Sequence, residues 1–305
     1  MQPHRPPPTG TPTSHRSNRS VTSPVIPPEG VLVVDKPSDW TSFDVVNKVR
    51  AVLSRHWRQQ PSWPTQQAPQ RPPIHKSRRK RQLLRVGHGG TLDPIATGVL
   101  VVAVGEVYTR RLGELQAGRK RYRAGFQLGR ATDTQDCTGV VTEESSFAHL
   151  ASNGYQQCCA MLASPLFTGT LRQRPPLYSA VRVRGRHLYD YARAGEADLL
   201  DEVPERTVTV YHIACTQWDA EQGTGTLELE CSGGTYVRTL IDNLGRQLGT
   251  HAIMTWLQRT RVGPYTLCEE DGPVLRGATD LDDVPRILGA LRTGMSVDTP
   301  ADGER

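Results

Sequence analysis

The stretch GHGGTLDPIATGVLVVAV, residues 87–104, places a glycine-rich loop directly before an apolar strand. Four glycines and a proline surround one carboxylate, that of Asp93. Glycine lets the backbone of another molecule approach closely, so this loop can present Asp93 to a ligand with little steric cover. The loop lacks the Gly-Lys-Ser/Thr of a phosphate-binding P-loop and the spacing of a dinucleotide fingerprint. The alternative is a structural turn in which Asp93 bonds its own backbone before Pro94.

Apolar patterns on both sides of this stretch predict the rest of a sheet. Val31–Val34 is a short apolar run typical of a buried strand, and a helix with valines at helical spacing follows it, capped by Thr41 or Ser42. Residues 122–128 alternate between apolar and polar side chains, which is the period of a half-buried strand. A further strand is expected at 179–183, and strands at 207–215 and 226–231 are expected to pair as a hairpin across 223–225.

Helices are interspersed among these strands without regular alternation. Their patterns predict helices at 106–116, 147–162, 186–194 and 236–248. Strands joined by short turns, with helices placed irregularly between them, favour an α+β fold with a mostly antiparallel mixed sheet and flanking helices.

The basic charge of the chain lies toward its N-terminal part. Lys and Arg number 37 against 31 Asp and Glu, a formal net charge of +6 with a pI near 9.1. No acidic residue precedes Glu29, and none lies between Asp44 and Asp93. An overall excess of this size often serves only solubility, but clustered Arg and Lys indicate a phosphate-rich partner, with nucleic acid as the first candidate.

Two segments lack the apolar residues that a folded core requires. Residues 1–28 are rich in Pro, Arg, Ser and Thr, and we expect a disordered basic arm there, although an organelle transit peptide has the same composition. Residues 54–85 form a basic insertion that contains KSRRKR at 76–81. The insertion is either a solvated linker or an arm that binds phosphates.

The cysteines and the apolar content indicate a cytoplasmic protein without a metal site. The six cysteines show no C-x-x-C pair and no Cys/His spacing of the zinc-site kind, so we expect them to be reduced and structural. No apolar run of about 18 residues is present, so no membrane-spanning helix is expected.

The loop around Asp93 resembles the signature of the TruB family of pseudouridine synthases. Four further blocks match that family in the same order: GVLVVDKP at 30–37, KRYR at 120–123 with TDT at 132–134, LYSA at 177–180 with LYDYAR at 188–193, and CSGGTYVR at 231–238. The match covers residues 29–265 and implies a pseudouridine synthase fold. Many members of the family also carry a C-terminal RNA-binding module of the PUA type. The acidic residues 266–305 leave no room for a full module, so we expect a short acidic tail there.

The resemblance implies an isomerase that converts the T-loop uridine of tRNA into pseudouridine. Such an enzyme uses an aspartate nucleophile, flips the target base out of the folded loop, and needs neither a cofactor nor a metal. We therefore expect the T arm of tRNA as the partner of a monomer that requires no other protein.

The resemblance also implies a role for each candidate site residue. Asp93 is the expected nucleophile, Arg238 its ion-pair partner, and Tyr122 the ring that stacks on the flipped base. The remaining expected substrate contacts are His88, Tyr236, Leu257 and Lys36, with Tyr236 also able to transfer a proton.

Two other functions are compatible with the residues alone. One is a non-catalytic RNA-binding or RNA-folding protein on the same scaffold, for which Asp93 would be dispensable. The other is a metal-dependent hydrolase that uses His88 and Asp93, which is disfavoured because two ligands without a further His/Asp/Glu cluster seldom hold a catalytic metal.

Overall fold

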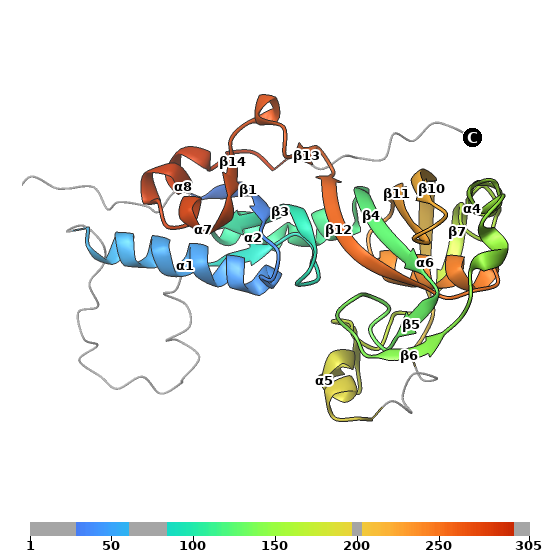
Figure 1. Ribbon diagram of the computed structural model, residues 1–305. Helices are drawn as coiled ribbons and strands as arrows, with labels where there is room; N and C mark the ends of the chain where they lie inside the picture. The colour runs from blue at the N-terminus through green and yellow to red at the C-terminus, as the bar shows by residue number, and fades with distance from the viewer. Residues whose placement is uncertain (1–28, 61–83, 197–202, 296–305) are drawn as a thin grey trace, which may run out of the picture.

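The computed structural model describes residues 29–60, 84–196 and 203–295 of the chain (Figure 1). A ten-stranded mixed sheet runs through the molecule. Its order is β14 (Val274–Arg276), β1 (Gly30–Lys36), β3 (Thr97–Val104), β12 (Ala252–Val262), β4 (Lys120–Leu128), β11 (Thr224–Cys231), β10 (Arg206–Asp219) and β7 (Gly169–Gln173), with β2 (Val86–His88) on β3 and β13 (Tyr265–Thr266) on β12. The β1–β14 and β3–β12 pairings are parallel and all the others in this sheet are antiparallel, which confirms the expected α+β class.

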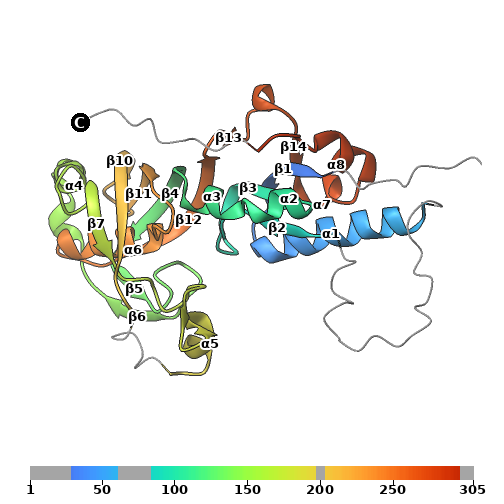
Figure 2. The ribbon, with the colours of Figure 1, turned by 180° about the vertical axis from the view of Figure 1, so that it is seen from behind.

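The helices divide the molecule into two halves that meet between β3 and β12 (Figures 1 and 2). The half with β1, β2, β3 and β14 packs against α1 (Ser42–Arg58) and α8 (Val284–Ala290). The half with β4, β7, β10, β11 and β12 packs against α4 (Gly154–Leu162) and α6 (Val237–Gln247). The two halves are joined by a parallel ladder of two residue pairs, Gln258 with Thr97 and Arg259 with Gly98. We call this ladder the seam.

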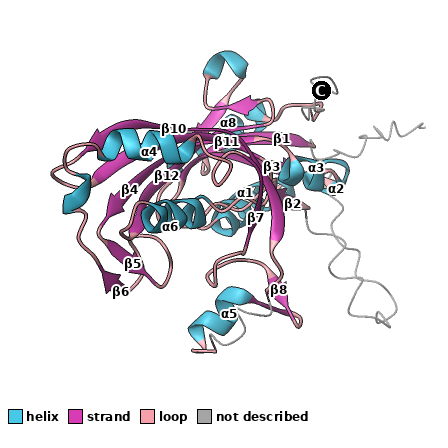
Figure 3. Cartoon of the chain, turned by 90° about the vertical axis from the view of Figure 1, so that its right-hand side faces the viewer, coloured by secondary structure: helices cyan, strands magenta, loops and turns pink. Residues whose placement is uncertain are grey.

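Smaller elements surround the two halves. The remaining helices are α2 (Glu106–Arg110), α3 (Leu112–Ala117), α5 (Leu188–Arg193), α7 (Gly277–Asp280) and the 3₁₀ turns Ala148–Leu150 and Glu269–Asp271. Two small hairpins pair β5 (Arg130–Thr132) with β6 (Val141–Glu144) and β8 (Arg182–Val183) with β9 (Arg186–His187). In Figure 3, β8 and α5 project away from the sheet.

The capping of α1 explains where this helix begins. Thr41 is the N-cap, and it forms a capping box with Asp44, so the sequence placed the start correctly. The helix runs through Ser54 to Arg58, beyond the point where the insertion was expected to begin. The extra turn forms because Trp57, one turn after Leu53, is also buried and extends the apolar face.

The alternation at 122–128 does form a half-buried strand, β4. Its apolar side chains lie in the core, while Arg121 and Arg123 on the other face form ion pairs with Glu230 and Glu228 of β11. These cross-strand pairs support the register between β4 and β11.

Other expected elements differ in extent. The helix expected at 106–116 is broken at Arg111 into α2 and α3. The helix expected at 147–162 is a 3₁₀ turn followed by α4, and the strand expected at 179–183 is reduced to β8. The predicted hairpin is present as β10 and β11, with bulges at two places.

The segment expected to be an acidic tail is partly folded into the first half. Within it, β14 pairs with β1, and Ile287 and Ala290 of α8 are buried in the core. Val31 also exchanges two backbone hydrogen bonds with Arg292. The sequence did not predict this because β14 is too short to show a periodic pattern.

Some expectations concern residues outside the described part of the chain. These are the basic arm at 1–28, the central part of the insertion at 61–83, and the C-terminal residues 296–305. Among the described residues, no helix is both long and apolar enough to cross a membrane.

Candidate active site

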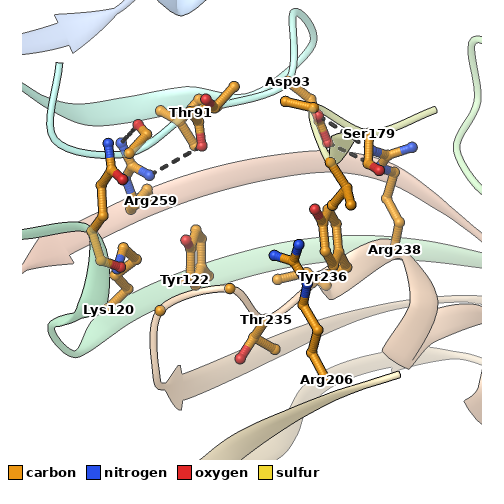
Figure 4. A pocket seen from close by; sticks show the side chains of 18 of the residues that line it. Thr91, Asp93, Lys120, Tyr122, Ser179, Arg206, Thr235, Tyr236, Arg238 and Arg259 are labelled. Carbon is orange, nitrogen blue, oxygen red and sulfur yellow. Dashed lines mark hydrogen bonds and ion pairs between the residues drawn. The ribbon is translucent and has the colours of Figure 1, made fainter. Parts of the chain in front are cut away.

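A pocket of about 650 Å³ opens where the two halves meet (Figure 4). One wall is the loop that carries Asp93, between β2 and β3. The turn before α6, residues 179–182 and residues of α3 complete the walls, and β4 and β12 form the floor. Asp93, Tyr122, Tyr236, Arg238 and Leu257, which the resemblance named, all line this pocket.

Asp93 and Arg238 form an ion pair with two contacts. Arg238 Nε lies 2.9 Å from Asp93 Oδ2, and Arg238 Nη2 donates to Asp93 Oδ1 at 3.2 Å. The Arg238 side chain is 4% exposed, whereas that of Asp93 is 32% exposed and faces the pocket. A two-point contact of this kind fixes the orientation of the carboxylate as well as its charge.

Arg238 is itself held by backbone carbonyls. Its Nη1 donates to Thr134 O at 2.7 Å, and its Nη2 donates to Tyr178 O at 3.0 Å. Asp136 Oδ2 lies 3.8 Å from Nη1 and is buried. The guanidinium therefore has little freedom to leave Asp93.

The environment of Asp93 shifts its pKa in opposing directions. Burial raises the pKa of the Asp93 carboxyl above its ordinary value, the Arg238 guanidinium lowers it, and Asp136 adds a smaller upward contribution. The net shift of the pKa is upward. Arg238 is thus the group that most strongly favours the ionised form that a nucleophile requires.

Lys36 supports the Asp93 loop and does not line the pocket. It has no exposed surface, and its Nζ donates to the carbonyls of Pro37 (2.8 Å), Pro94 (3.0 Å) and Trp40. Burial lowers its pKa to about 8. All three donors are used by carbonyls that fix the end of β1 and the loop, so Lys36 holds this loop in place, and its contact with substrate stays a prediction.

His88 also lies outside the residues that line the pocket. It belongs to β2 and is half-buried, and its Nδ1 has no hydrogen-bond partner among the described residues. Burial and the nearby Arg259 lower the pKa of the imidazole, which favours the neutral ring. The expected contact of His88 with the RNA, near the position that the flipped base vacates, stays a prediction.

The two tyrosines of the pocket come from different elements of the fold. Tyr122 of β4 is 8% exposed and forms part of the pocket floor, and burial raises its pKa to about 12, so its phenol stays neutral. Tyr236 precedes α6, and burial also raises its pKa, with a smaller opposing contribution from Ser179. Both rings project into the pocket in Figure 4.

Sequence reasoning missed several cations of the pocket. Arg259 of β12 is buried and donates to Val99 O (2.8 Å), Gly90 O (3.0 Å) and Thr91 O (3.4 Å), so it supports the Asp93 loop from below. Lys120 is buried, and its Nζ donates to carbonyls at the end of α3. In the sequence, Arg259 and Lys120 look like ordinary strand residues, so only the fold identifies them as cations of the pocket. Arg182 and Arg206 complete the cations of the pocket.

The described residues hold no group of three His, Cys, Asp or Glu side chains arranged to bind a metal ion.

The class of the protein follows from what it matches: it is a pseudouridine synthase. The chain belongs to the TruB family, since residues 78–237 match the family described as TruB family pseudouridylate synthase (N terminal domain).

Curated relatives and a solved structure agree with that assignment. The chain is 36% identical over 260 residues to human pseudouridylate synthase TRUB1, covering 85% of this chain and 67% of the relative. It is 39% identical over 242 residues to tRNA pseudouridine synthase B of Heliobacterium mobile, covering 79% of this chain and 66% of the relative. The chain thus spans about two thirds of the length of these relatives. A chain in the crystal structure of a Cbf5–Nop10–Gar1 complex superposes with a TM-score of 0.51 at 25% identity, covering 83% of this chain and 54% of that chain.

Proposed function

We propose that this protein converts the T-loop uridine of tRNA into pseudouridine, with Asp93 as the nucleophile and the target base flipped into the pocket. The observation that carries the proposal is the Asp93 carboxylate, which faces the pocket and is held at two points by the buried Arg238. The name of the Heliobacterium relative, tRNA pseudouridine synthase B, supports tRNA as the substrate.

The reaction exchanges one bond of the nucleotide for another. The bond between uracil N1 and ribose C1′ breaks, a bond between uracil C5 and C1′ forms, C5 loses a proton, and N1 gains one. Asp93 makes a transient covalent bond, either to the ribose or to the uracil ring, and leaves with its electron pair when the new bond is complete. Atoms and electrons balance within the nucleotide, so the isomerisation consumes no co-reactant.

The other residues of the pocket fit this sequence of steps. Arg238 keeps Asp93 ionised and oriented. The ring of Tyr122 offers an aromatic surface on which a flipped base stacks, and Leu257 bounds the same space. Tyr236, on the same side as Arg238, is positioned to contact the substrate or to transfer a proton (Figure 4). We further propose that the enzyme acts as a cytoplasmic monomer on the T arm, without an obligatory protein partner.

The test is to incubate the purified protein with a tRNA transcript and to map pseudouridine base by base. We expect pseudouridine at the T-loop uridine with the wild type and none with Asp93→Asn, while tRNA binding by this variant stays close to wild type. The matched control is Asp282→Asn, an exposed carboxylate paired with Lys48 in the first half. Turnover by Asp93→Asn near the wild-type rate would remove Asp93 from the mechanism. Tight binding without any isomerisation by the wild type would instead favour an RNA-binding protein.

A further inference from the structure

We infer that Arg182 and Arg206 form a binding site for backbone phosphates of the RNA next to the flipped uridine. This inference rests on the proposed function and adds the part of the substrate that these two residues recognise. Both line the pocket, and both are exposed.

The pocket carries more positive charge than Asp93, the base and the ribose can balance. One carboxylate, Asp93, lies among five cations: Lys120, Arg182, Arg206, Arg238 and Arg259. Uracil and ribose carry no formal charge at neutral pH, so the excess has no counterpart in the base or the sugar. In RNA the phosphodiester is the group that supplies negative charge.

Three of the five cations are already committed to protein partners. Arg238 bonds Asp93 and two carbonyls, while Lys120 and Arg259 each donate to three carbonyls. All three are buried. Their donors hold the walls of the pocket, so little is left for a ligand.

Arg182 and Arg206 differ from these three in both respects. Within residues 29–60, 84–196 and 203–295, the side chain of neither makes a hydrogen bond or an ion pair. Arginines on the strands paired with theirs do have such partners: Arg172 of β7 pairs with Glu205 at 3.0 Å, and Arg186 of β9 pairs with Glu196 at 3.3 Å. The fork of a guanidinium without a partner matches two oxygens of a phosphate.

The position of Arg206 directs its charge into the pocket. It is the first residue of β10, and in Figure 4 its side chain extends beside Tyr236 toward the interior. It is also close enough to lower the pKa of the Tyr236 phenol, although burial dominates the shift. A phosphate bound here would lie next to the groups that hold the flipped nucleotide.

The backbone at Gly234, which lines the same pocket as Arg206, also leaves room for a nucleic acid strand. Gly234 lines the pocket with φ +85, and a Cβ built on it would have no atom within 4 Å. The space beside the backbone at this turn is therefore open, and a glycine allows a sugar-phosphate chain to approach it closely.

The experiment tests whether each arginine contacts one particular phosphate. RNA stem-loops of the T-arm sequence are prepared with one neutral methylphosphonate at each position on either side of the target uridine, and binding is measured with wild type, Arg206→Gln and Arg182→Gln. We expect each variant to weaken binding of unmodified RNA about tenfold, the scale of a hydrogen bond to a charged group. We also expect the log–log salt slope to fall by about 0.7 for each phosphate that the variant no longer neutralises.

Coupling identifies the phosphate. At one flanking position, the methylphosphonate should weaken wild-type binding about as much as Arg206→Gln does. The same methylphosphonate should cause no further loss of affinity in Arg206→Gln. A second position should show this pattern with Arg182→Gln. Arg206→Lys should recover part of the affinity. Arg172→Gln and Arg186→Gln are the matched controls, because these exposed arginines on the paired strands have carboxylate partners.

The inference is overturned if Arg206→Gln and Arg182→Gln bind RNA like their controls. It is also overturned if, at every position, the arginine change and the methylphosphonate reduce affinity independently of each other. A wild-type scan in which no flanking methylphosphonate weakens binding would also overturn the inference, and this part of the test does not depend on the folding of any variant. Because the readout is binding, a wild type that binds with this coupling but forms no pseudouridine contradicts the proposed function and leaves the phosphate site standing.

Discussion

Ser42 and Leu92 lie 50 residues apart in the sequence and share two hydrogen bonds. The Ser42 hydroxyl accepts from the backbone N–H of Leu92 at 2.8 Å and donates to the Leu92 carbonyl at 3.2 Å. Ser42 is the first residue of α1 and is buried, and Leu92 directly precedes Asp93. The start of α1 thus holds the position of the proposed nucleophile.

Ser42→Ala should reduce the rate of isomerisation at saturating tRNA more than it reduces tRNA binding. The change leaves both backbone groups of Leu92 without their buried partner, at a cost of about 1–3 kcal/mol of folding free energy, and releases the residue next to Asp93. Single-turnover kinetics and thermal melting measure the two effects. Ser38→Ala, at an exposed serine near the same end of the helix, is the control. Unchanged kinetics in Ser42→Ala would show that the loop does not need this contact.

The pH dependence of the isomerisation rate should reflect the ionisation of Asp93 beside Arg238. The Asp93 pKa is raised, so the single-turnover rate should fall toward low pH at a higher pH than an ordinary aspartate would give. Arg238 lowers that pKa, so Arg238→Gln should move the acid limb of the profile to still higher pH and reduce the plateau rate. The measurement is the pH–rate profile of both proteins under single-turnover conditions. An acid limb at the same pH in both would mean that another group controls it.

Tyr122→Phe should retain most of the turnover, whereas Tyr122→Ala should lose it. Stacking uses the ring, and a phenol with a pKa of about 12 does not act as a base near neutral pH. Tyr122 is also a core residue, so the alanine variant is compared at a temperature where melting shows it to be folded. Equal losses in the two variants would argue against stacking and for a role of the hydroxyl.

Arg259→Lys should destabilise the protein by about 3 kcal/mol or more, because an ammonium cannot reach the three carbonyls that the guanidinium joins. Denaturant unfolding gives the free energy. The control is Arg123→Lys, at an exposed residue paired with Glu228, for which a change within about 0.5 kcal/mol is expected. Similar stability of the two variants would contradict a supporting role for Arg259.

The basic insertion is expected to add affinity that does not depend on RNA sequence. Changing Arg78, Arg79, Lys80 and Arg81 to Ser should weaken tRNA binding and flatten its salt dependence, with a log–log slope smaller by roughly 0.7 to 0.9 for each phosphate that is no longer neutralised. The rate at saturating tRNA should be retained. Salt titrations of binding for wild type and variant make the comparison, and identical slopes and affinities would identify the insertion as a passive linker.

The sequence predicted those elements of the fold whose apolar periodicity or capping is visible within a few neighbouring residues. The alternation in β4 and the capping of α1 are local, and both were predicted from a few residues. The three-residue β14 shows no such pattern, because its place in the sheet depends on pairing with β1 at the other end of the chain.

For the site, the resemblance named the residues, but only the fold showed which of them face the pocket. Lys36 is buried because carbonyls from two segments meet at its ammonium, one of them 58 residues away. Arg259 bonds carbonyls 160 or more residues away in the sequence. Whether a cation is buried and bonded or free to meet a ligand is decided by such distant partners, so the contrast between Arg259 and Arg206 was not visible in the sequence.

The seam between β3 and β12 depends on a glycine. Asp93 belongs to one half and Arg238 to the other, while the sheet is continuous between the halves through only two residue pairs. At Gly98 even a methyl group would lie 2.2 Å from the Arg259 carbonyl oxygen, so the two strands lie side by side with no side chain between them. Any larger residue at position 98 would push the two strands apart, and with them the two halves that supply Asp93 and Arg238.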